Sequence, residues 1–286
     1  MKPGATELTV ILRDATSRAS GEAARQRLAG AKAALATLSC TIPVVIGFLV
    51  PALVLLDFAL KRLDDFASAR LLEALVTSIT VSGLAAIVAV IFGLTLAYAV
   101  RSHASPRTRS LARLASLGYA IPGTVLAIGI MITLTGIDRS LGYLGNWSSG
   151  AVLSGTLVAL VFAYTVRFLA LAHGTLEAGF GRISPHMDMA ARSLGTTRSQ
   201  TLFRVHIFLL RPPVLAALLL VFVDVMKELP ATLVLRPFDF DTLATLVYMR
   251  ASLGQLEEAA LPALMIILVG LVPVLIALML LDTQHR

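Results

Sequence analysis

Six long apolar stretches constrain the fold of this chain more than any other feature. They run near Ala34–Leu56, Leu75–Val100, Leu114–Thr135, Ala151–Ala172, Leu209–Met226 and Leu261–Leu281. Most reach the roughly 20 residues that a helix needs to cross about 30 Å of hydrocarbon, and the fifth is the shortest. Hydrocarbon offers the backbone no hydrogen bonds, so each stretch is predicted to be a helix. The sequence therefore predicts an all-α membrane protein with a six-helix transmembrane bundle.

Composition supports this class. Hydrophobic residues make up 57% of the chain and charged residues only 14%, whereas a soluble domain has about 25% charged residues. The formal net charge is +7, but the cations are sorted by membrane side and are not clustered with aromatic residues. That pattern argues against nucleic acid as a partner and leaves membrane lipid as the expected surroundings.

The positions of Lys and Arg predict the orientation. Three regions on one side of the membrane are rich in cations: Lys2, Arg13, Arg18, Arg25, Arg27 and Lys32; Arg101, Arg107, Arg109 and Arg113; and Arg182, Arg192, Arg198, Arg204 and Arg211. The alternate connections are poorer in unmatched cations. Both termini are therefore predicted to be cytoplasmic in a multi-pass membrane protein. Residues 1–33 are predicted to form a partly disordered N-terminal segment, and residues 34–282 the six-helix domain.

A polar insert at residues 184–212 is patterned as structure and not as a linker. Ser184 and Pro185 are typical of a helix start. A short helix is predicted from His186 to Leu194, and Gly195 stands where a left-handed cap would end it. Thr196 or Thr197 is then expected to cap a second helix that leads into the membrane.

This insert resembles the EAA loop of permeases from bacterial ATP-binding-cassette (ABC) importers. The resemblance rests on Ala190 and Ala191, on Gly195, and on Val205 and Ile207 at the family's spacing. It implies a cytoplasmic coupling helix that docks in a groove of a separate ATPase subunit. The residues assigned to coupling are Asp188, Met189, Ala190, Ala191, Arg192 and Gly195.

Two positions depart from the family pattern. Met189 stands where glutamate is usual, and Phe208 where proline is usual. Asp188 is adjacent to the missing charge, but it points about 100° away on a helix. These departures keep open a rival interpretation, an uncoupled or truncated half-permease that serves as a membrane scaffold.

A second resemblance lies in KELPATLVLRPFDFDTLATLVY, which begins at Lys227. It is similar to ferric-iron importer permeases, whose C-terminal half the chain resembles; the permeases for thiamine and phosphonate are related. This resemblance implies import of Fe³⁺, or of another small solute, across the bacterial inner membrane by alternating access. It also implies a periplasmic substrate-binding protein and either a second permease half or a homodimer as partners.

The candidate pathway or gate residues follow the fifth stretch: Asp224, Lys227, Glu228 and Pro230. An ion pair between Asp224 and Lys227 is the simpler interpretation of that spacing. Arg167 lies near the predicted end of the fourth stretch and is expected to extend toward the lipid headgroups, or to pair with the acidic part of the insert.

No catalytic arrangement is found in the sequence. It contains no GxxxxGK[ST] phosphate loop and no HExxH motif, so the chain is not expected to be an enzyme or to need a cofactor. Tyr98, Tyr119 and Tyr164 have no spacing that indicates a metal site, and the metal ligands, if any, stay unassigned.

Overall fold

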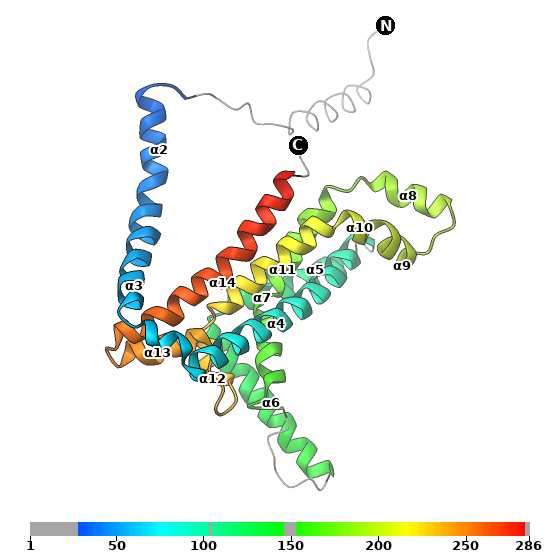
Figure 1. Ribbon diagram of the computed structural model, residues 1–286. Coiled ribbons are helices and arrows are strands. Elements are labelled where there is room, and N and C mark those ends of the chain that lie inside the picture. Colours follow the sequence, from blue (N-terminus) through cyan, green and yellow to red (C-terminus); the bar gives the residue numbers. More distant parts are fainter. Residues whose placement is uncertain (1–27, 103–104, 146–152, 284–286) are drawn as a thin grey trace. The chain divides into compact units, whose positions relative to one another are not determined.

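The computed structural model describes residues 28–102, 105–145 and 153–283, all of them in helices, turns or irregular segments (Figure 1). Residues 1–27 of the predicted N-terminal segment lie outside the described residues. The chain divides into two compact units, Met1–Leu53 and Val54–Arg286. The second unit holds all of the predicted site residues.

The first unit contains the beginning of the first apolar stretch. Helix α2 (Ala31–Val44) passes through a π-helical turn, η1 (Val45–Leu49), into α3 (Val50–Leu60). The π turn follows Pro43, which has no N–H to give to the helix and therefore disturbs its hydrogen-bond ladder. Ala31–Leu60 is long and apolar enough to cross a membrane.

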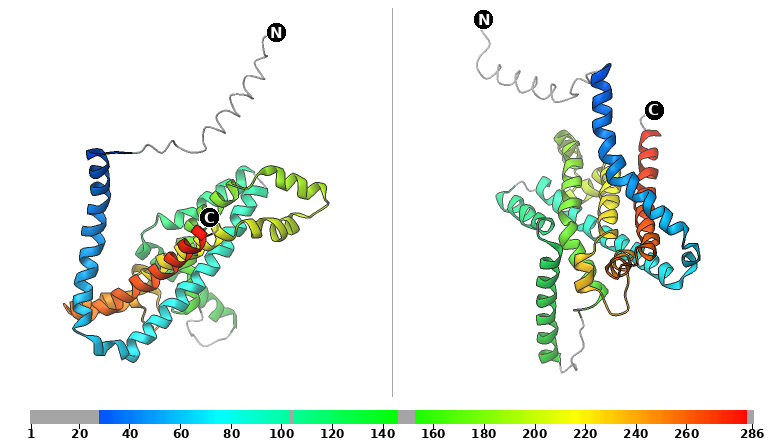
Figure 2. Two further views of the ribbon diagram at one scale, coloured as in Figure 1. Left: turned by 45° about the horizontal axis from the view of Figure 1, so that its top comes forward. Right: turned by 90° about the vertical axis from the view of Figure 1, so that its left-hand side faces the viewer.

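Three helices form the core of the second unit: α4 (Ala69–Ser102), α7 (Leu157–Gly181) and α11 (Arg211–Met226). Small residues let α4 and α7 approach closely. A Cβ added to Gly93 on α4 would lie 2.9 Å from the Cβ of Ala172 on α7, so a larger residue there would push the two helices apart. Figure 2 shows these helices running side by side.

Two further helices pack beside this core, α6 (Gly123–Gly145) and α14 (Leu256–Thr283). Helix α6 begins later than the predicted third stretch, which starts at Leu114. The intervening residues form the end of α5 (Pro106–Ala115) and a 3₁₀ turn, η3 (Ser116–Tyr119). Pro122 then precedes Gly123, where α6 starts.

In the described part of the chain, five helices are long and apolar enough to span a membrane, and a sixth span arises if the bent pair Ser199–Leu209 and Arg211–Met226 counts as one. The pair is bent by 75°. The structure therefore agrees with the prediction of an all-α bundle of about six spans, and the bend lies at the start of the short fifth stretch.

The two ends of the second unit carry different short elements. Helix α7 leads into α8 (Pro185–Ser193), α9 (Arg198–Thr201), η4 (Leu202–His206) and α10 (Ile207–Leu209), which together we call the elbow. Helix α11 then returns to the other end, here called the far end, which consists of η2 (Leu63–Ala67), α12 (Pro230–Leu235) and α13 (Leu243–Ser252). In Figure 1 the elbow projects beyond α4 and α7.

Candidate functional site

The elbow has the local structure that the sequence predicts. The amide of His186 donates to Ser184 Oγ over 3.3 Å at the start of α8, and Gly195 ends the turn after α8 with φ of 76°. Thr197 caps α9: Gln200 N–H donates to Thr197 Oγ1 over 3.3 Å, and Thr197 N–H donates to Gln200 Oε1 over 2.9 Å. This reciprocal cap fixes the entry into the second arm of the elbow.

The Asp188 carboxylate ties α8 to the rest of the unit. Arg101, at the end of α4, donates to Asp188 Oδ2 from Nη2 over 2.7 Å and from Nε over 3.1 Å. His206 Nε2 lies 2.7 Å from Asp188 Oδ1, and the His206 side chain is buried. A carboxylate held by a guanidinium through two N–H groups has a fixed direction as well as a favourable energy.

Arg101 also fixes the junction between α7 and α8. Its Nη1 donates to the carbonyl of Phe180 over 2.7 Å and its Nη2 to the carbonyl of Ile183 over 3.1 Å. These carbonyls belong to the last turn of α7 and the segment after it, where the helical hydrogen-bond ladder ends; the Phe180 carbonyl also accepts from the amide of Ile183 over 3.1 Å. The charge of Asp188 is therefore paired within this unit, where it holds the elbow against the end of α4.

The outward side of α8 exposes apolar side chains beside the polar His186 and Ser193. Met189 and Ala190 point outward while Ala191 is buried. The turn after α8 adds Leu194, whose residue surface is 84% exposed, and η4 adds Phe203 at 69%. The side chain of Arg192 lies outside the described part. A large apolar surface on a short projecting element is typical of a protein-binding site.

The pathway candidates lie where α11 ends. Lys227 Nζ is 2.8 Å from Asp224 Oδ1, so the predicted ion pair is present. Pro230 begins α12. Glu228 is buried, its side chain only 3% exposed.

Glu228 is paired with Arg167, which the sequence analysis placed near the lipid headgroups or the polar insert. Its Oε1 lies 3.4 Å from Nε of Arg167. The expectation that Arg167 extends to the headgroups or pairs with the insert is therefore wrong. The physical reason is that α7 continues through His173 to Gly181, so that Arg167 lies near its middle, whereas the apolar stretch in the sequence ends at Ala172.

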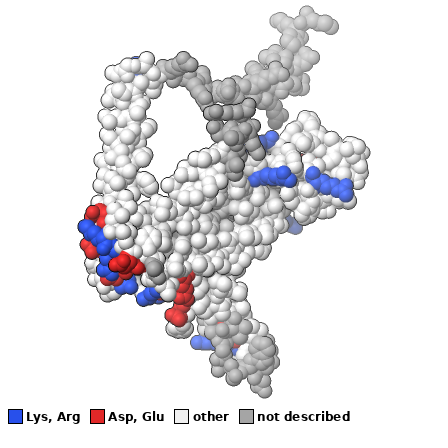
Figure 3. Space-filling model, in the orientation of Figure 1, with Lys and Arg blue, Asp and Glu red and all other residues white. Residues whose placement is uncertain are grey.

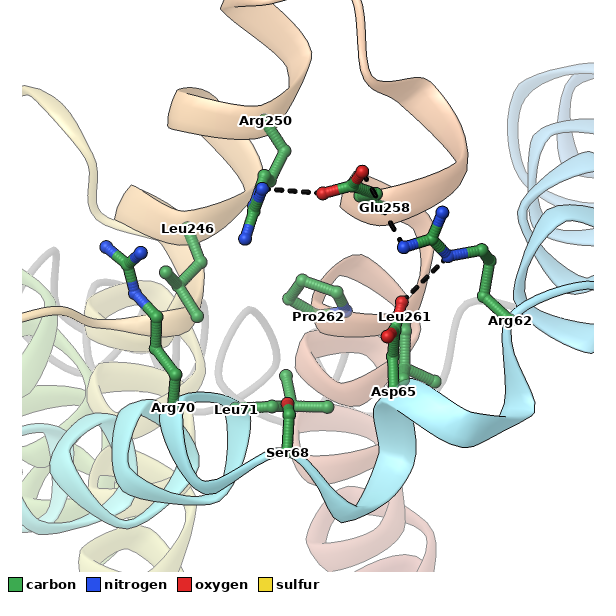
Figure 4. Close-up of a pocket in the computed structure, with 10 residues that line it drawn as sticks. All are labelled: Arg62, Asp65, Ser68, Arg70, Leu71, Leu246, Arg250, Glu258, Leu261 and Pro262. Carbon is green, nitrogen blue, oxygen red and sulfur yellow. Dashed lines mark hydrogen bonds and ion pairs between the residues drawn. The ribbon is translucent and has the colours of Figure 1, made fainter.

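The far end carries a small cavity of about 160 Å³ with charged walls (Figure 4). Arg62 pairs with Asp65 at 2.8 Å and with Glu258 at 3.6 Å, and Glu258 also pairs with Arg250 at 2.5 Å. Figure 3 shows acidic and basic side chains gathered at this end of the visible face, with an uncharged surface between them and the elbow.

No metal site is formed by the described residues. Among residues 28–102, 105–145 and 153–283, no group of three or more His, Cys, Asp or Glu is arranged to hold a metal ion. Tyr164 is instead hydrogen-bonded in the core, where its Oη lies 2.5 Å from Oγ1 of Thr232.

Sequence comparison finds relatives among transport permeases, although the sequence matches no family model. The chain is 31% identical over 216 residues to the Fe(3+)-transport system permease protein FbpB 2 of Haemophilus influenzae, covering 76% of this chain and 40% of the relative. It is 28% identical to the putative 2-aminoethylphosphonate transport system permease protein PhnV of Salmonella typhimurium, covering 70% of each. It is 30% identical to the trehalose transport system permease protein SugB of Mycobacterium tuberculosis, covering 64% of this chain and 61% of the relative.

Structure comparison finds the same fold in a bacterial alginate ABC transporter. One chain of that importer superposes with a TM-score of 0.71 at 16% identity, covering 98% of this chain and 100% of the other. A chain of its complex with an alginate-bound periplasmic protein gives 0.69 at 18% identity, covering 85% and 91%. At these identities the comparison concerns the fold alone.

Proposed function

Because this chain belongs to the inner-membrane permeases of ABC importers, we propose that it forms half of the transmembrane pathway of a solute importer and is coupled to a separate ATPase through its elbow. The chain spans 40% of the length of FbpB 2. The other half of the proposed pathway is a second permease half or a second copy of this chain, related by a pseudo-two-fold axis.

The exposed apolar face of the elbow carries this proposal. Met189, Leu194 and Phe203 are presented to the surroundings while Asp188 holds α8 rigidly from behind. A rigid projection transmits a push from an ATPase better than a flexible loop. The proposed coupling segment also includes Ala190, Ala191, Arg192 and Gly195.

The orientation follows from the elbow. With the elbow in the cytosol on the ATPase side, both termini are cytoplasmic and the far end faces the periplasm, where a substrate-binding protein delivers the solute. Asp224, Lys227, Glu228 and Pro230 then lie toward the periplasmic side of the pathway, as a gate. The uncharged surface between the two ends contacts lipid.

Ferric iron is the proposed cargo, supported by the similarity to FbpB 2 and by the stretch that begins at Lys227. A phosphonate is the second candidate, because PhnV is matched over 70% of its length. The solute crosses by alternating access, and this chain supplies no catalysis.

Binding of the ATPase to the elbow tests the proposal. Replacing Leu194 and Phe203 by Ser removes two large apolar contacts and is expected to weaken binding of the partner ATPase by about tenfold or more. Uptake of radiolabelled ferric iron or 2-aminoethylphosphonate should fall in parallel. Ile132→Ser is the matched control, since Ile132 is similarly exposed but lies on α6. Unchanged ATPase binding in the double variant would contradict the proposal and would favour an uncoupled scaffold.

A further inference from the structure

Arg167 lies near the middle of a membrane span. It is about 15 Å along the axis of α7 from Leu157 and about 21 Å from Gly181, at 1.5 Å per residue. The hydrocarbon layer is about 30 Å thick, so this guanidinium is near its centre. A charged side chain at that depth is strongly unfavourable in lipid and marks a functional position.

The pairing of Arg167 leaves part of its guanidinium unused. Its Nε is next to Glu228, and its Nη1 donates to the carbonyl of Ile121 over 3.3 Å. Among the described residues, no hydrogen bond involves Nη2. The Arg167 side chain remains 21% exposed although Glu228 is buried. Because Nε is itself buried, we infer that the exposed part of the side chain includes the Nη2 edge of the guanidinium.

Gly123 keeps the backbone of α6 close to the ion pair. A Cβ at this position would lie 2.6 Å from Nη1 of Arg167 and 2.8 Å from Oε1 of Glu228. The start of α6 and the exposed Ile121 just before it therefore lie beside the free edge of the guanidinium. Any residue other than glycine would displace the pair.

The exposed edge of Arg167 cannot face hydrocarbon, so it must meet water or another protein. We propose that it borders the water-filled pathway of the assembled permease and contacts an oxyanion group of the passing solute. A guanidinium suits this task because its planar N–H groups match carboxylate and phosphate oxygens. The solute class is therefore a carboxylate, phosphate or phosphonate, and ferric iron would pass as a complex whose ligands are anionic. This inference rests on the proposed permease function.

Cysteine labelling in membranes that contain the full chain and its partners tests the inference. The single native cysteine, Cys40, is replaced by Ala, and Ile121→Cys places a thiol beside Arg167. Two hydrophilic methanethiosulfonates of opposite charge are compared, together with a lipophilic maleimide. Val158→Cys is the control, because Val158 is exposed on an apolar groove of α4 and α7 and should react only with the maleimide.

Three results are expected. The thiol at position 121 reacts with both charged reagents, and the anionic one gains roughly threefold or more over the cationic one in Glu228→Gln, with the opposite change in Arg167→Gln. Methylphosphonate or citrate slows the labelling, whereas choline at equal ionic strength does not. If Arg167→Gln fails to accumulate in the membrane, the ratio of the two labelling rates in Glu228→Gln, compared with the ratio in the parent, tests the inference by itself.

Other outcomes overturn the inference. Failure of both charged reagents to label the thiol would show that lipid or protein covers this edge. A rate ratio that is independent of charge at positions 167 and 228, or the absence of protection by anions, would remove the oxyanion contact. Since labelling does not depend on ATPase docking, these failures are distinguishable from failure of the elbow experiment.

Discussion

At the scale of single residues, the Asp188 carboxylate connects the elbow to the rest of the unit through Arg101 and His206. Asp188→Ala removes the acceptor of Arg101 and leaves the buried His206 without its anionic neighbour. The free energy of unfolding is expected to fall by about 1–3 kcal/mol, lower than for a fully buried pair because Asp188 and Arg101 retain some contact with solvent. The melting temperature of the purified chain in detergent measures this change.

Met189→Ala is the matched control for Asp188→Ala. It lies next to Asp188 but points outward, so its effect should stay within about 0.5 kcal/mol. Equal melting temperatures for the two variants would mean that Asp188 does not brace the elbow.

The contacts of Asp241 with Arg70 and Arg236 at the far end are expected to be sensitive to acid. Partial burial acts to raise its pKa, but hydrogen bonds from Arg70 and Arg236 outweigh burial and hold the pKa of this carboxyl below its ordinary value. The contribution of Asp241 to stability is therefore complete above about pH 4, the ordinary carboxylate pKa, and is lost as the pH falls through the lower folded pKa. Asp241→Asn should reduce stability at neutral pH and flatten its decline in acid, as measured by melting temperature against pH. Parallel pH curves for the variant and the parent would contradict this.

Residue contacts were predictable from the sequence only where they are local. Ser184, Gly195 and Thr197 act on their own neighbours, so their cap and turn signals predicted the elbow correctly. Arg101 pairs with Asp188 across 87 positions, and nothing in either neighbourhood indicates the other. The same limit hid the pairing of Arg167 with Glu228.

At the scale of an element, Gly195 fixes the angle between the two arms of the elbow. Its φ of 76° is left-handed, and nothing lies within 4 Å of an added Cβ. Gly195→Val should therefore act through backbone strain of about 1–3 kcal/mol and not through a clash, straightening the turn and uncoupling transport. Gly195→Asn is the control, since Asn tolerates this conformation. Solute uptake and ATPase stimulation should be lost in the Val variant and kept in the Asn variant; full uptake with Val would reject this role for the turn.

Helix boundaries were predicted less well than helix existence. Apolar composition indicates which residues contact lipid or core, but a helix also continues through polar residues, as α7 does at His173 and Glu177. Conversely, apolar residues continue across the break before α6, where Pro122 and η3 turn the chain. Composition alone cannot distinguish a turn made of apolar residues from a helix.

At the scale of the whole molecule, the mid-membrane position of Arg167 argues that this chain does not function alone. Its exposed guanidinium edge would face hydrocarbon in an isolated half, and lipid is the least favourable surrounding for it. A partner half that encloses a shared aqueous pathway removes this conflict.

The stoichiometry of the active complex tests this argument. Native mass spectrometry of the complex extracted in mild detergent with its ATPase is expected to show two permease halves, either two copies of this chain or one copy with a related chain. The double variant Arg167→Gln with Glu228→Gln removes both charges and should allow the isolated half to persist in lipid nanodiscs better than the parent, because neither polar amide carries the cost of a charge facing hydrocarbon. A lone chain that transports solute at the full rate would contradict the two-half assembly. Equal persistence of the parent and the double variant in nanodiscs would instead show that the Arg167 edge does not require a partner.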